Sequence, residues 1–507
     1  MRGRFIMERR SGILLSISSL PSKYGIGCFD KAAYDFVDFL EKAGQKYWQI
    51  LPLGSTCHGE PSDSPYQAYS AFAGNPYFIN LETLVGEGVL TTEECEAINF
   101  GKNAAKVDYD ALYDNRFALL RKAYERSNIS ENWGFQEFCK QNFWWLDDYA
   151  LFMSLRNFFD GAPWTEWPDD IRKHYPPAVA YYQEKLYFDV EFQKYMQFKF
   201  WEHWSNLKRY ANEKGIMIVG DMPIYVSPDG SDVWAHPELF QLTWDNRPSQ
   251  VAGCPPDNFA ADGQVWGNPL YRWDHHRNTG FEWWVSRMWY SYQLYDMIRL
   301  DHFRGFDEYY AIPVGGTALE GHWEKGPGMD LFRTLSHRLG YKPIIAEDLG
   351  LITDSVRHLV WESGFPNMKV LQFAFEKEDK GGTNEYLPHN YYTDNCVIYT
   401  GTHDNETICG WFKGLDAETE NLVRGYLGAY DVAANKIHTR FIAAAMACNA
   451  ETCIVPIQDW LGLDNSARMN IPGTVDVNWR WRLKEGQITD KLAEQIYYMT
   501  KVTKRLK

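Results

Sequence analysis

Eight short apolar runs recur along the chain, and several of them end in polar or acidic residues. They cover residues 12–18, 47–53, 217–223, 297–301, 343–347, 368–373, 397–402 and 453–458. Continuous apolar runs of this length are typical of strands that are buried on both faces, as in parallel sheets. The pattern therefore predicts eight buried strands.

Helical periodicity fills several of the intervals between these runs. It spans residues 30–43, 192–214, 330–339 and 354–363, and each of the four spans is followed by a glycine (Gly44, Gly215, Gly340 and Gly364). A glycine just past an apolar periodic segment is a common helix stop, and here another strand follows it closely. Strands that alternate with helices in this way predict an α/β fold, and eight of them predict a (β/α)₈ barrel.

Two intervals are too long for a simple strand–helix unit. Residues 84–192 are polar, aromatic and helix-like, which predicts an inserted helical subdomain. Residues 224–295 are rich in Gly, Pro, Asp and Trp, which predicts loops over the cleft at the barrel mouth. We expect residues 1–507 to form a single catalytic barrel, without room for a C-terminal β-sandwich after the eighth strand.

Composition narrows the classes of ligand. Apolar residues make up 45% of the chain and charged residues 23%, and the formal net charge is −16. The negative charge argues against nucleic acid or an anionic membrane as a partner and suits a neutral substrate. Aromatic residues reach 16%. They fit either a large aromatic core or stacking surfaces for sugar rings, because Tyr and Trp serve both.

The nine cysteines are scattered and form no C-x-x-C pair. This pattern predicts reduced thiols in the cytoplasm and neither a disulfide framework nor a zinc site. The adjacent pair His275-His276 has no second cluster at ligand spacing, so we expect a surface loop there and no bound metal. We find no signal peptide and no apolar stretch long enough to span a bilayer.

Acidic residues gather where the predicted strands end. Asp221 ends the third strand, Asp301 the fourth and Glu347 the fifth, while Asp404 follows the seventh and Asp459 the eighth. Active sites of (β/α)₈ barrels lie at the C-terminal ends of the strands. We therefore expect these acids to converge on one mouth, although any one of them alone could be a loop cap or a surface charge.

Two of these acids have the surroundings that glycoside cleavage needs. Arg299 and Asp301 share a face of their strand, so the guanidinium can hold Asp301 ionised as a nucleophile. Glu347 lies on an apolar strand, which should raise its pKa and suit it to general acid and base catalysis. Read alone, Arg299 and Asp301 could equally form a structural ion pair. Asp404 would grip sugar hydroxyls, and His302, beside Asp301, would contact the substrate.

Long motifs make the chain resemble the 4-α-glucanotransferases of the amylomaltase, or disproportionating enzyme, family (glycoside hydrolase family 77). The motifs are SSLPS (18–22), LPLG (51–54), DSPYQ (63–67), AFAGNPY (71–77), GDMPI (220–224), WGNPLY (266–271), RLDHFRG (299–305), AEDLG (346–350), GTHDN (401–405) and RMNIPGT (468–474). The resemblance runs nearly end to end.

The resemblance implies a cofactor-free transferase that acts on α-1,4-glucans, from maltooligosaccharides and amylose to starch or glycogen. By position in the motifs, Asp301 would be the nucleophile, Glu347 the acid and base, and Asp404 the transition-state stabiliser. The implied substrate contacts are Arg299, Asp221, His403, Tyr66, Asn470, Phe373, Trp266 and Phe259. The segment 251–271 would lie over the cleft and help to take the acceptor. Many relatives have an aromatic directly after Pro-Pro-Asp, but here that position is Asn258.

Two alternatives remain open from the residues alone. A retaining α-glucan hydrolase of the same clan would use the same acids, and a barrel that binds glucan without turnover would keep the cleft. Retention predicts that the carboxyl groups of Asp301 and Glu347 lie about 5–5.5 Å apart.

Overall fold

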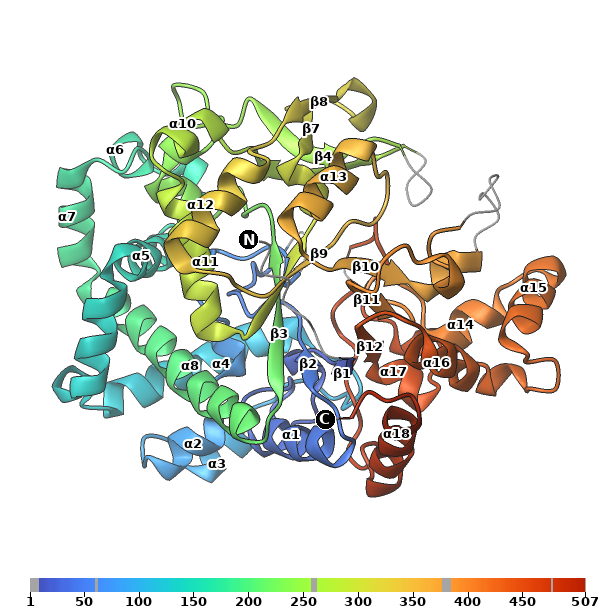
Figure 1. Ribbon diagram of the computed structural model, residues 1–507. Helices are drawn as coiled ribbons and strands as arrows, with labels where there is room; N and C mark the ends of the chain where they lie inside the picture. Colours follow the sequence, from blue (N-terminus) through green and yellow to red (C-terminus); the bar gives the residue numbers. More distant parts are fainter. Residues whose placement is uncertain (1–8, 60–62, 257–261, 376–383, 476, 507) are drawn as a thin grey trace.

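Eight parallel strands form a closed barrel at the centre of the computed structural model (Figure 1), which describes residues 9–59, 63–256, 262–375, 384–475 and 477–506. Around the barrel the order is β1-β2-β3-β6-β9-β10-β11-β12, and β12 pairs with β1. The strands are β1 (Arg10–Leu14), β2 (Tyr47–Gln49), β3 (Met217–Pro223), β6 (Met297–Asp301), β9 (Ile344–Ala346), β10 (Asn367–Val370), β11 (Cys396–Tyr399) and β12 (Thr452–Pro456). This confirms the predicted barrel class.

The predicted apolar runs all overlap barrel strands. β3 and β6 have the predicted bounds, whereas β2 ends at Gln49 and β11 at Tyr399, before the apolar runs themselves end. The remaining residues of these runs, such as Leu51 and Leu53, stay buried although they have left the sheet. A continuous apolar run therefore indicates residues that are buried at the barrel mouth as well as residues that are paired in the sheet.

The four predicted helices lie outside the barrel. They are α1 (Lys31–Lys42), α8 (Tyr187–Glu213), α12 (Met329–Leu339) and α13 (Asp354–Ser363), and α8 begins earlier than its periodicity predicted. Gly44, Gly215, Gly340 and Gly364 follow them with φ of 66°, 77°, 73° and 72°. These angles lie in the left-handed region, which glycine adopts without the clash of a Cβ, so the glycines end the helices as expected.

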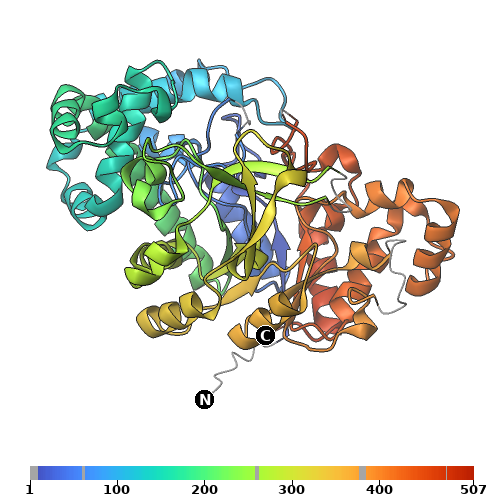
Figure 2. The ribbon, with the colours of Figure 1, turned by 90° about the horizontal axis from the view of Figure 1, so that it is seen from above.

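Residues 84–192 are largely helical in the structure. They contain α3 (Thr92–Glu96), α4 (Tyr109–Arg126), α5 (Trp133–Phe158), α6 (Asp169–Arg172) and α7 (Pro176–Lys185), and α2 (Leu81–Gly86) precedes them. Phe198 of α8 packs between Phe135 and Phe138 of α5. Figures 1 and 2 place these helices on one side of the barrel, opposite α14 (Ile408–Lys413) and α15 (Ala417–Leu427).

The segment 224–295 contains regular structure that the sequence pattern did not predict. It holds α9 (Ser231–Ala235), β4 (Gln250–Cys254), β5 (Gln264–Pro269), α10 (Trp273–Asn278) and α11 (Glu282–Leu294). β4 and β5 join β7 (Glu308–Pro313) and β8 (His322–Lys325) in an antiparallel sheet of order β5-β4-β7-β8. Two chain segments on either side of β6 thus build one small sheet beyond the barrel strands (Figure 1).

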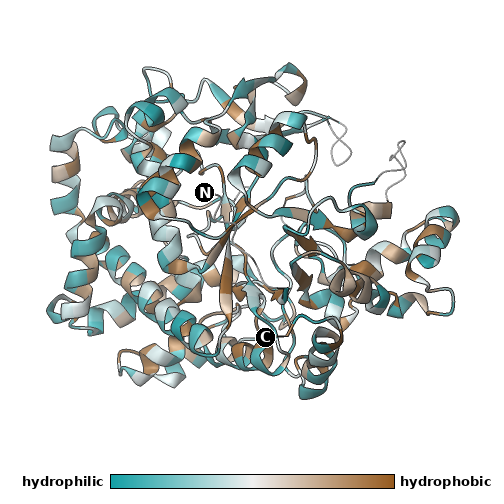
Figure 3. Ribbon diagram, viewed as in Figure 1, coloured by the Kyte–Doolittle hydropathy of each residue, from teal (hydrophilic) through white to brown (hydrophobic). Residues whose placement is uncertain are grey.

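The remaining helices follow the last two strands. α16 (His438–Ala447) precedes β12, and α17 (Ile457–Leu461) and α18 (Asp490–Val502) follow it. Figure 3 shows brown, hydrophobic residues along β3, while the outer helices carry both colours. Among the described residues, no helix combines the length and the apolar character that crossing a membrane requires.

Candidate active site

The register of the barrel brings the predicted acids to one face. Asp221 of β3 pairs with Arg299 of β6, and Leu300 pairs with Ala346 of β9. Residues in register on parallel strands point to the same side, and successive residues alternate. Asp221, Arg299 and Asp301 therefore share the barrel interior with Glu347, the residue after Ala346.

Arg299 links two carboxylates. Its Nη1 lies 2.8 Å from both oxygens of Asp221 and 2.8 Å from Oδ1 of Asp301. The Arg299 and Asp221 side chains are 3% and 0% exposed, while that of Asp301 is 27% exposed. Asp221 is thus the buried counter-ion, and Asp301 is the carboxylate with an open side. The guanidinium of Arg299 thus forms an ion pair with each of the two carboxylates.

Glu347 accepts two backbone hydrogen bonds at the end of β9. His302 N donates to Oε2 at 2.7 Å, and Leu349 N donates to Oε1 at 2.9 Å. Burial nevertheless raises the pKa of Glu347, against the lowering effect of Arg299 and with a further rise from Asp301, to a net value of about 7. The expected rise is therefore present, and Glu347 can hold or release a proton near neutral pH.

The loop after β11 supplies a second charged pair. His403 Nε2 lies 3.2 Å from Asp404 Oδ2, and Asn470 Nδ2 donates to Asp404 Oδ1 at 2.7 Å. Burial opposes both charges, but the attraction outweighs it: Asp404 raises the pKa of His403, and His403 lowers that of Asp404. Asp404 is thereby held ionised at the cleft.

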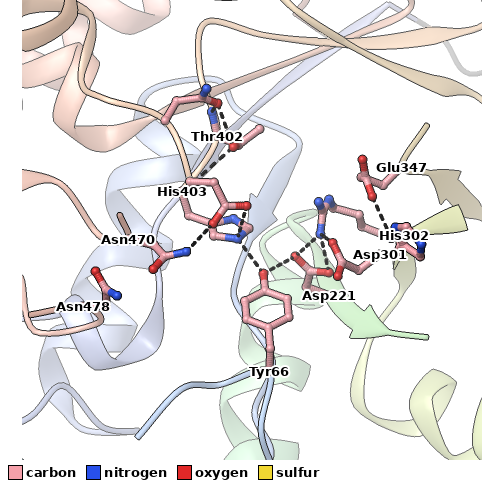
Figure 4. Close-up of polar contacts among 12 residues, drawn as sticks. Tyr66, Asp221, Asp301, His302, Glu347, Thr402, His403, Asn470 and Asn478 are labelled. Carbon is pink, nitrogen blue, oxygen red and sulfur yellow. Dashed lines mark hydrogen bonds and ion pairs between the residues drawn. The ribbon is translucent and has the colours of Figure 1, made fainter. Parts of the chain in front are cut away.

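Tyr66 connects the Arg299–Asp221 pair to the His403–Asp404 pair (Figure 4). Its hydroxyl donates to Asp221 Oδ2 at 3.0 Å and lies 2.8 Å from His403 Nε2. A hydroxyl has one proton to give, so His403 Nε2 must carry the proton of the second bond. One network therefore runs from Arg299 through Asp221 and Tyr66 to His403 and Asp404.

These side chains border an open cleft of about 690 Å³. Of the sequence-predicted site residues, the cleft is lined by Asp301, Glu347, Asp404, Arg299, His403, Tyr66, Asn470, Phe373, Trp266 and His302. Asp221 does not line it, because Asp221 is fully buried beneath Arg299 and Tyr66. Phe259 and Asn258 lie outside the described residues.

His302 occupies an unusual place beside Asp301. Its backbone φ is 53°, and its ring meets the Trp266 ring edge to face at 4.9 Å between centroids. Burial lowers the pKa of His302 to about 4, so the ring is neutral at ordinary pH. Its Nε2 has no hydrogen-bond partner among the described residues. A buried polar atom at a cleft wall is available to a substrate hydroxyl.

The cleft also contains residues that sequence reasoning did not single out. Tyr225, Arg304, Trp323, Asn478 and Trp479 all line it. The Arg304 guanidinium stacks on Trp323, 3.7 Å from the ring centroid, and donates to the Leu351 carbonyl. Trp323 belongs to β8, whose approach to the barrel is a tertiary event, so no local signal could have placed it there.

Besides Asp221, a second strand-end acid does not line the cleft. Asp459 is 2% exposed and accepts hydrogen bonds from Thr400 Oγ1 at 2.6 Å and Ile408 N at 2.9 Å. Asp348, next to Glu347, likewise turns away and accepts from Met368 N at 3.0 Å. The predicted convergence is therefore wrong for Asp459, because this residue lies within α17 and its side chain binds Thr400 and Ile408, at the two ends of the loop after β11.

Among the described residues, one acidic group with a histidine, Glu87, Glu202 and His203, has the spacing of a metal site. Lys199 Nζ already lies 2.9 Å from a carboxylate oxygen of each acid. His203 Nδ1 accepts from Asn80 N at 3.1 Å, so its Nε2 carries the proton and has no lone pair for a metal.

The predicted surface loop at His275-His276 is wrong, since His276 is buried in α10 and bonds the Leu239 carbonyl at 3.1 Å. We assign a metal to neither place.

Comparison with known proteins agrees with this geometry. The 4-alpha-glucanotransferase family model matches residues 15–489. A 4-alpha-glucanotransferase of Clostridium butyricum is 46% identical over 96% of this chain and 99% of its own length. One of Thermus thermophilus is 42% identical over 99% of this chain and 100% of its own length.

Solved structures give the same result. The amylomaltase of Streptococcus agalactiae, solved in complex with acarbose, superposes with a TM-score of 0.94 at 39% identity, covering 99% of this chain and 100% of that one. The amylomaltase of Corynebacterium glutamicum shares the fold, with a TM-score of 0.73 at 18% identity, over 98% of this chain and 75% of that one. From its sequence, its fold and its full-length relatives alike, this chain belongs to the glycoside hydrolase family 77 of 4-α-glucanotransferases.

Proposed function

We propose that this protein is a 4-α-glucanotransferase that moves a segment of one α-1,4-glucan to the 4-hydroxyl of another glucan or of glucose. The observation that carries the proposal is the pair Asp301 and Glu347 on adjacent strands. Asp301 is held by Arg299 at 2.8 Å, and Glu347 has a pKa of about 7. One ionised and one protonated carboxyl group beside a cleft are what retaining glycoside chemistry requires.

The reaction is a double displacement. Asp301 attacks the anomeric carbon of the donor glucan while Glu347 protonates the departing glycosidic oxygen, which leaves a covalent glucosyl-enzyme. The 4-hydroxyl of the acceptor then attacks the same carbon, Glu347 takes its proton, and the Asp301 ester bond breaks. Two inversions restore the α linkage. This chemistry predicts a separation of about 5–5.5 Å between the two carboxyl groups.

Asp404, which is paired with His403, stabilises the transition state. Asp404 is ionised and is held by Asn470 Nδ2 at 2.7 Å and by His403. A rigid carboxylate binds sugar hydroxyls more strongly as the ring flattens and gains positive charge. The chain of bonds from Arg299 through Asp221 and Tyr66 to His403 holds Asp404 in a fixed position relative to the nucleophile.

Transfer prevails over hydrolysis when the acceptor is bound in line and water is excluded. Trp266, Phe373, Trp323 and Trp479 supply aromatic surface along the 690 Å³ cleft. Sugar rings that stack on such surfaces displace water from the glucosyl-enzyme. Cleft-lining aromatics thus favour a glucan hydroxyl over water as the nucleophile of the second step.

A product ladder from maltotriose tests the proposal. The enzyme and an Asp301→Asn variant are incubated with maltotriose, and the products are separated by size. Glucose together with chains longer than maltotriose, and a blank Asp301→Asn control, is the expected result. Only shorter products would refute transfer and indicate an α-glucan hydrolase. Binding without any new product would indicate a glucan-binding protein without turnover.

We also propose that the protein acts in the cytoplasm. Cys28, Cys57, Cys95, Cys139, Cys396, Cys409, Cys448 and Cys453 are free thiols, which supports a reducing compartment. Activity should therefore be unchanged by dithiothreitol and lowered or unchanged by mild oxidants. A gain of activity on oxidation would contradict this assignment.

A further inference from the structure

The loop between β11 and α14, residues 400–407, carries His403 and Asp404. Inside the loop, Asn405 Oδ1 accepts from Thr402 N at 2.8 Å and from Thr402 Oγ1 at 2.9 Å. Asp404 N donates to Thr402 Oγ1 at 3.2 Å. These bonds set the shape of the turn. They do not by themselves set its position relative to Arg299 and Tyr66 across the cleft.

Asp459 holds both ends of this loop. Its Oδ2 accepts from Thr400 Oγ1 at 2.6 Å, at the start of the loop. Its Oδ1 accepts from Ile408 N at 2.9 Å, at the first residue of α14. Asp459 itself follows β12, the barrel neighbour of β11, with Tyr399 in register with Ile454. One side chain in α17, the helix directly after β12, is thus bound to both ends of the loop.

The chemical identity of Asp459 fits this role. It is 2% exposed, and no Lys or Arg forms an ion pair with it in the described ranges of the chain. A buried carboxylate without a cation is costly, so an amide or an apolar side chain would be favoured on stability alone. A carboxylate, however, accepts from both groups as they stand, whereas an amide that accepts from Ile408 N would have to donate to Thr400 Oγ1 and so reverse that hydrogen bond.

We propose that Asp459 is a positioning residue for the transfer reaction, which fixes the 400–407 loop so that His403 and Asp404 meet Tyr66 and Arg299. The inference rests on the proposed function, because Asp404 is taken to bind the substrate in the transition state. A displacement of about 1 Å at such a group lowers turnover about 100-fold. Asp459 acts through the loop and does not itself line the cleft.

The first test compares Asp459→Asn, Thr400→Val and Thr400→Ser with the native enzyme. The fraction of competent enzyme is measured by trapping Asp301 with a slowly turned-over fluorinated glucosyl donor, so that unfolded protein is not counted. We expect Asp459→Asn to lower kcat by roughly 10- to 100-fold and to change KM for maltotriose by less than about threefold. Thr400→Val should show a smaller loss of kcat in the same direction. Thr400→Ser, which keeps the hydroxyl, should have the kcat of the native enzyme.

The second test is a double-mutant cycle with Asp404→Asn, using an α-maltosyl fluoride donor so that the slow variants remain measurable. If Asp459 acts through Asp404, the effect of Asp459→Asn should shrink to less than about twofold in the Asp404→Asn background. An equal fold-loss in both backgrounds would mean general stability and would overturn the inference.

The outcomes separate this inference from the proposed function. A native enzyme that gives no transfer products defeats the proposed function. A native enzyme that transfers while Asp459→Asn and Thr400→Val are as active as it is defeats only the positioning role. Should Asp459→Asn fail to fold, the Thr400 pair decides: a normal kcat for Thr400→Val in competent enzyme would overturn the inference.

Discussion

Replacing Glu347 with glutamine should make the protein more stable at alkaline pH while abolishing general acid catalysis. Burial moves the pKa of Glu347 from 4.5 to about 7 in the folded protein. At about 1.36 kcal/mol per pKa unit, ionising this folded carboxyl costs about 3 kcal/mol. Because the pKa of Glu347 is higher in the folded than in the unfolded state, ionisation of this carboxyl does not reduce the folding stability below pH 4.5. Stability is lost as the pH rises from 4.5 through 7, and the loss is complete above that range.

Glutamine is neutral at every pH and avoids this loss. Its NH₂ group would, however, face one of the two donors, His302 N or Leu349 N, which now bind the carboxyl at 2.7 and 2.9 Å. Losing that bond costs about 1 kcal/mol. The Gln variant should therefore be more stable than the native protein by about 2 kcal/mol at pH 8, and this advantage should vanish at pH 5.

Thermal unfolding at pH 5 and pH 8 measures the difference. With about 2.1 cal/mol/K of unfolding entropy per residue, 2 kcal/mol corresponds to about 2 °C in Tm for a chain of 507 residues. Glu485→Gln, at an exposed position, is the matched control and should show no pH-dependent change. A Glu347→Gln shift that is equal at both pH values, or a loss of stability at pH 8, would refute the reasoning.

Three further predictions concern the cleft. In native enzyme kcat/KM should fall about tenfold per pH unit above pH 7, as Glu347 loses its proton; a flat profile to pH 9 would contradict the assignment of the acid. Arg299→Met should lower the unfolding free energy by about 3–5 kcal/mol, because it leaves Asp221, 0% exposed, without a cation; a loss in chemical denaturation below about 1 kcal/mol would count against the buried pair. Trp323→Ala should raise KM for amylose about fivefold by removing roughly 1 kcal/mol of stacking, with Trp323→Phe nearer to native; equal KM values would exclude Trp323 from binding.

Much of the site was predictable because its chemistry lies at strand ends. Arg299, Asp301 and Glu347 follow directly from apolar runs, and a parallel barrel must bring such ends together. The same rule misplaced Asp459, since strand-end position does not say which way the chain turns next. The same rule could not predict that Tyr66 bridges Asp221 and His403, because these partners lie 155 and 337 residues from Tyr66 along the chain.

The sequence alone determined the eight buried strands, the helices that end at left-handed glycines, and the acids Asp301, Glu347 and Asp404 that line the cleft. These features depend on local periodicity and on residues adjacent in the chain. Only the tertiary structure decided that β4 and β5 pair with β7 and β8, that Trp323 reaches the cleft, and that Asp221 is buried while Asp301 is open. Those outcomes depend on contacts between distant segments, whose pairing and burial no local pattern encodes.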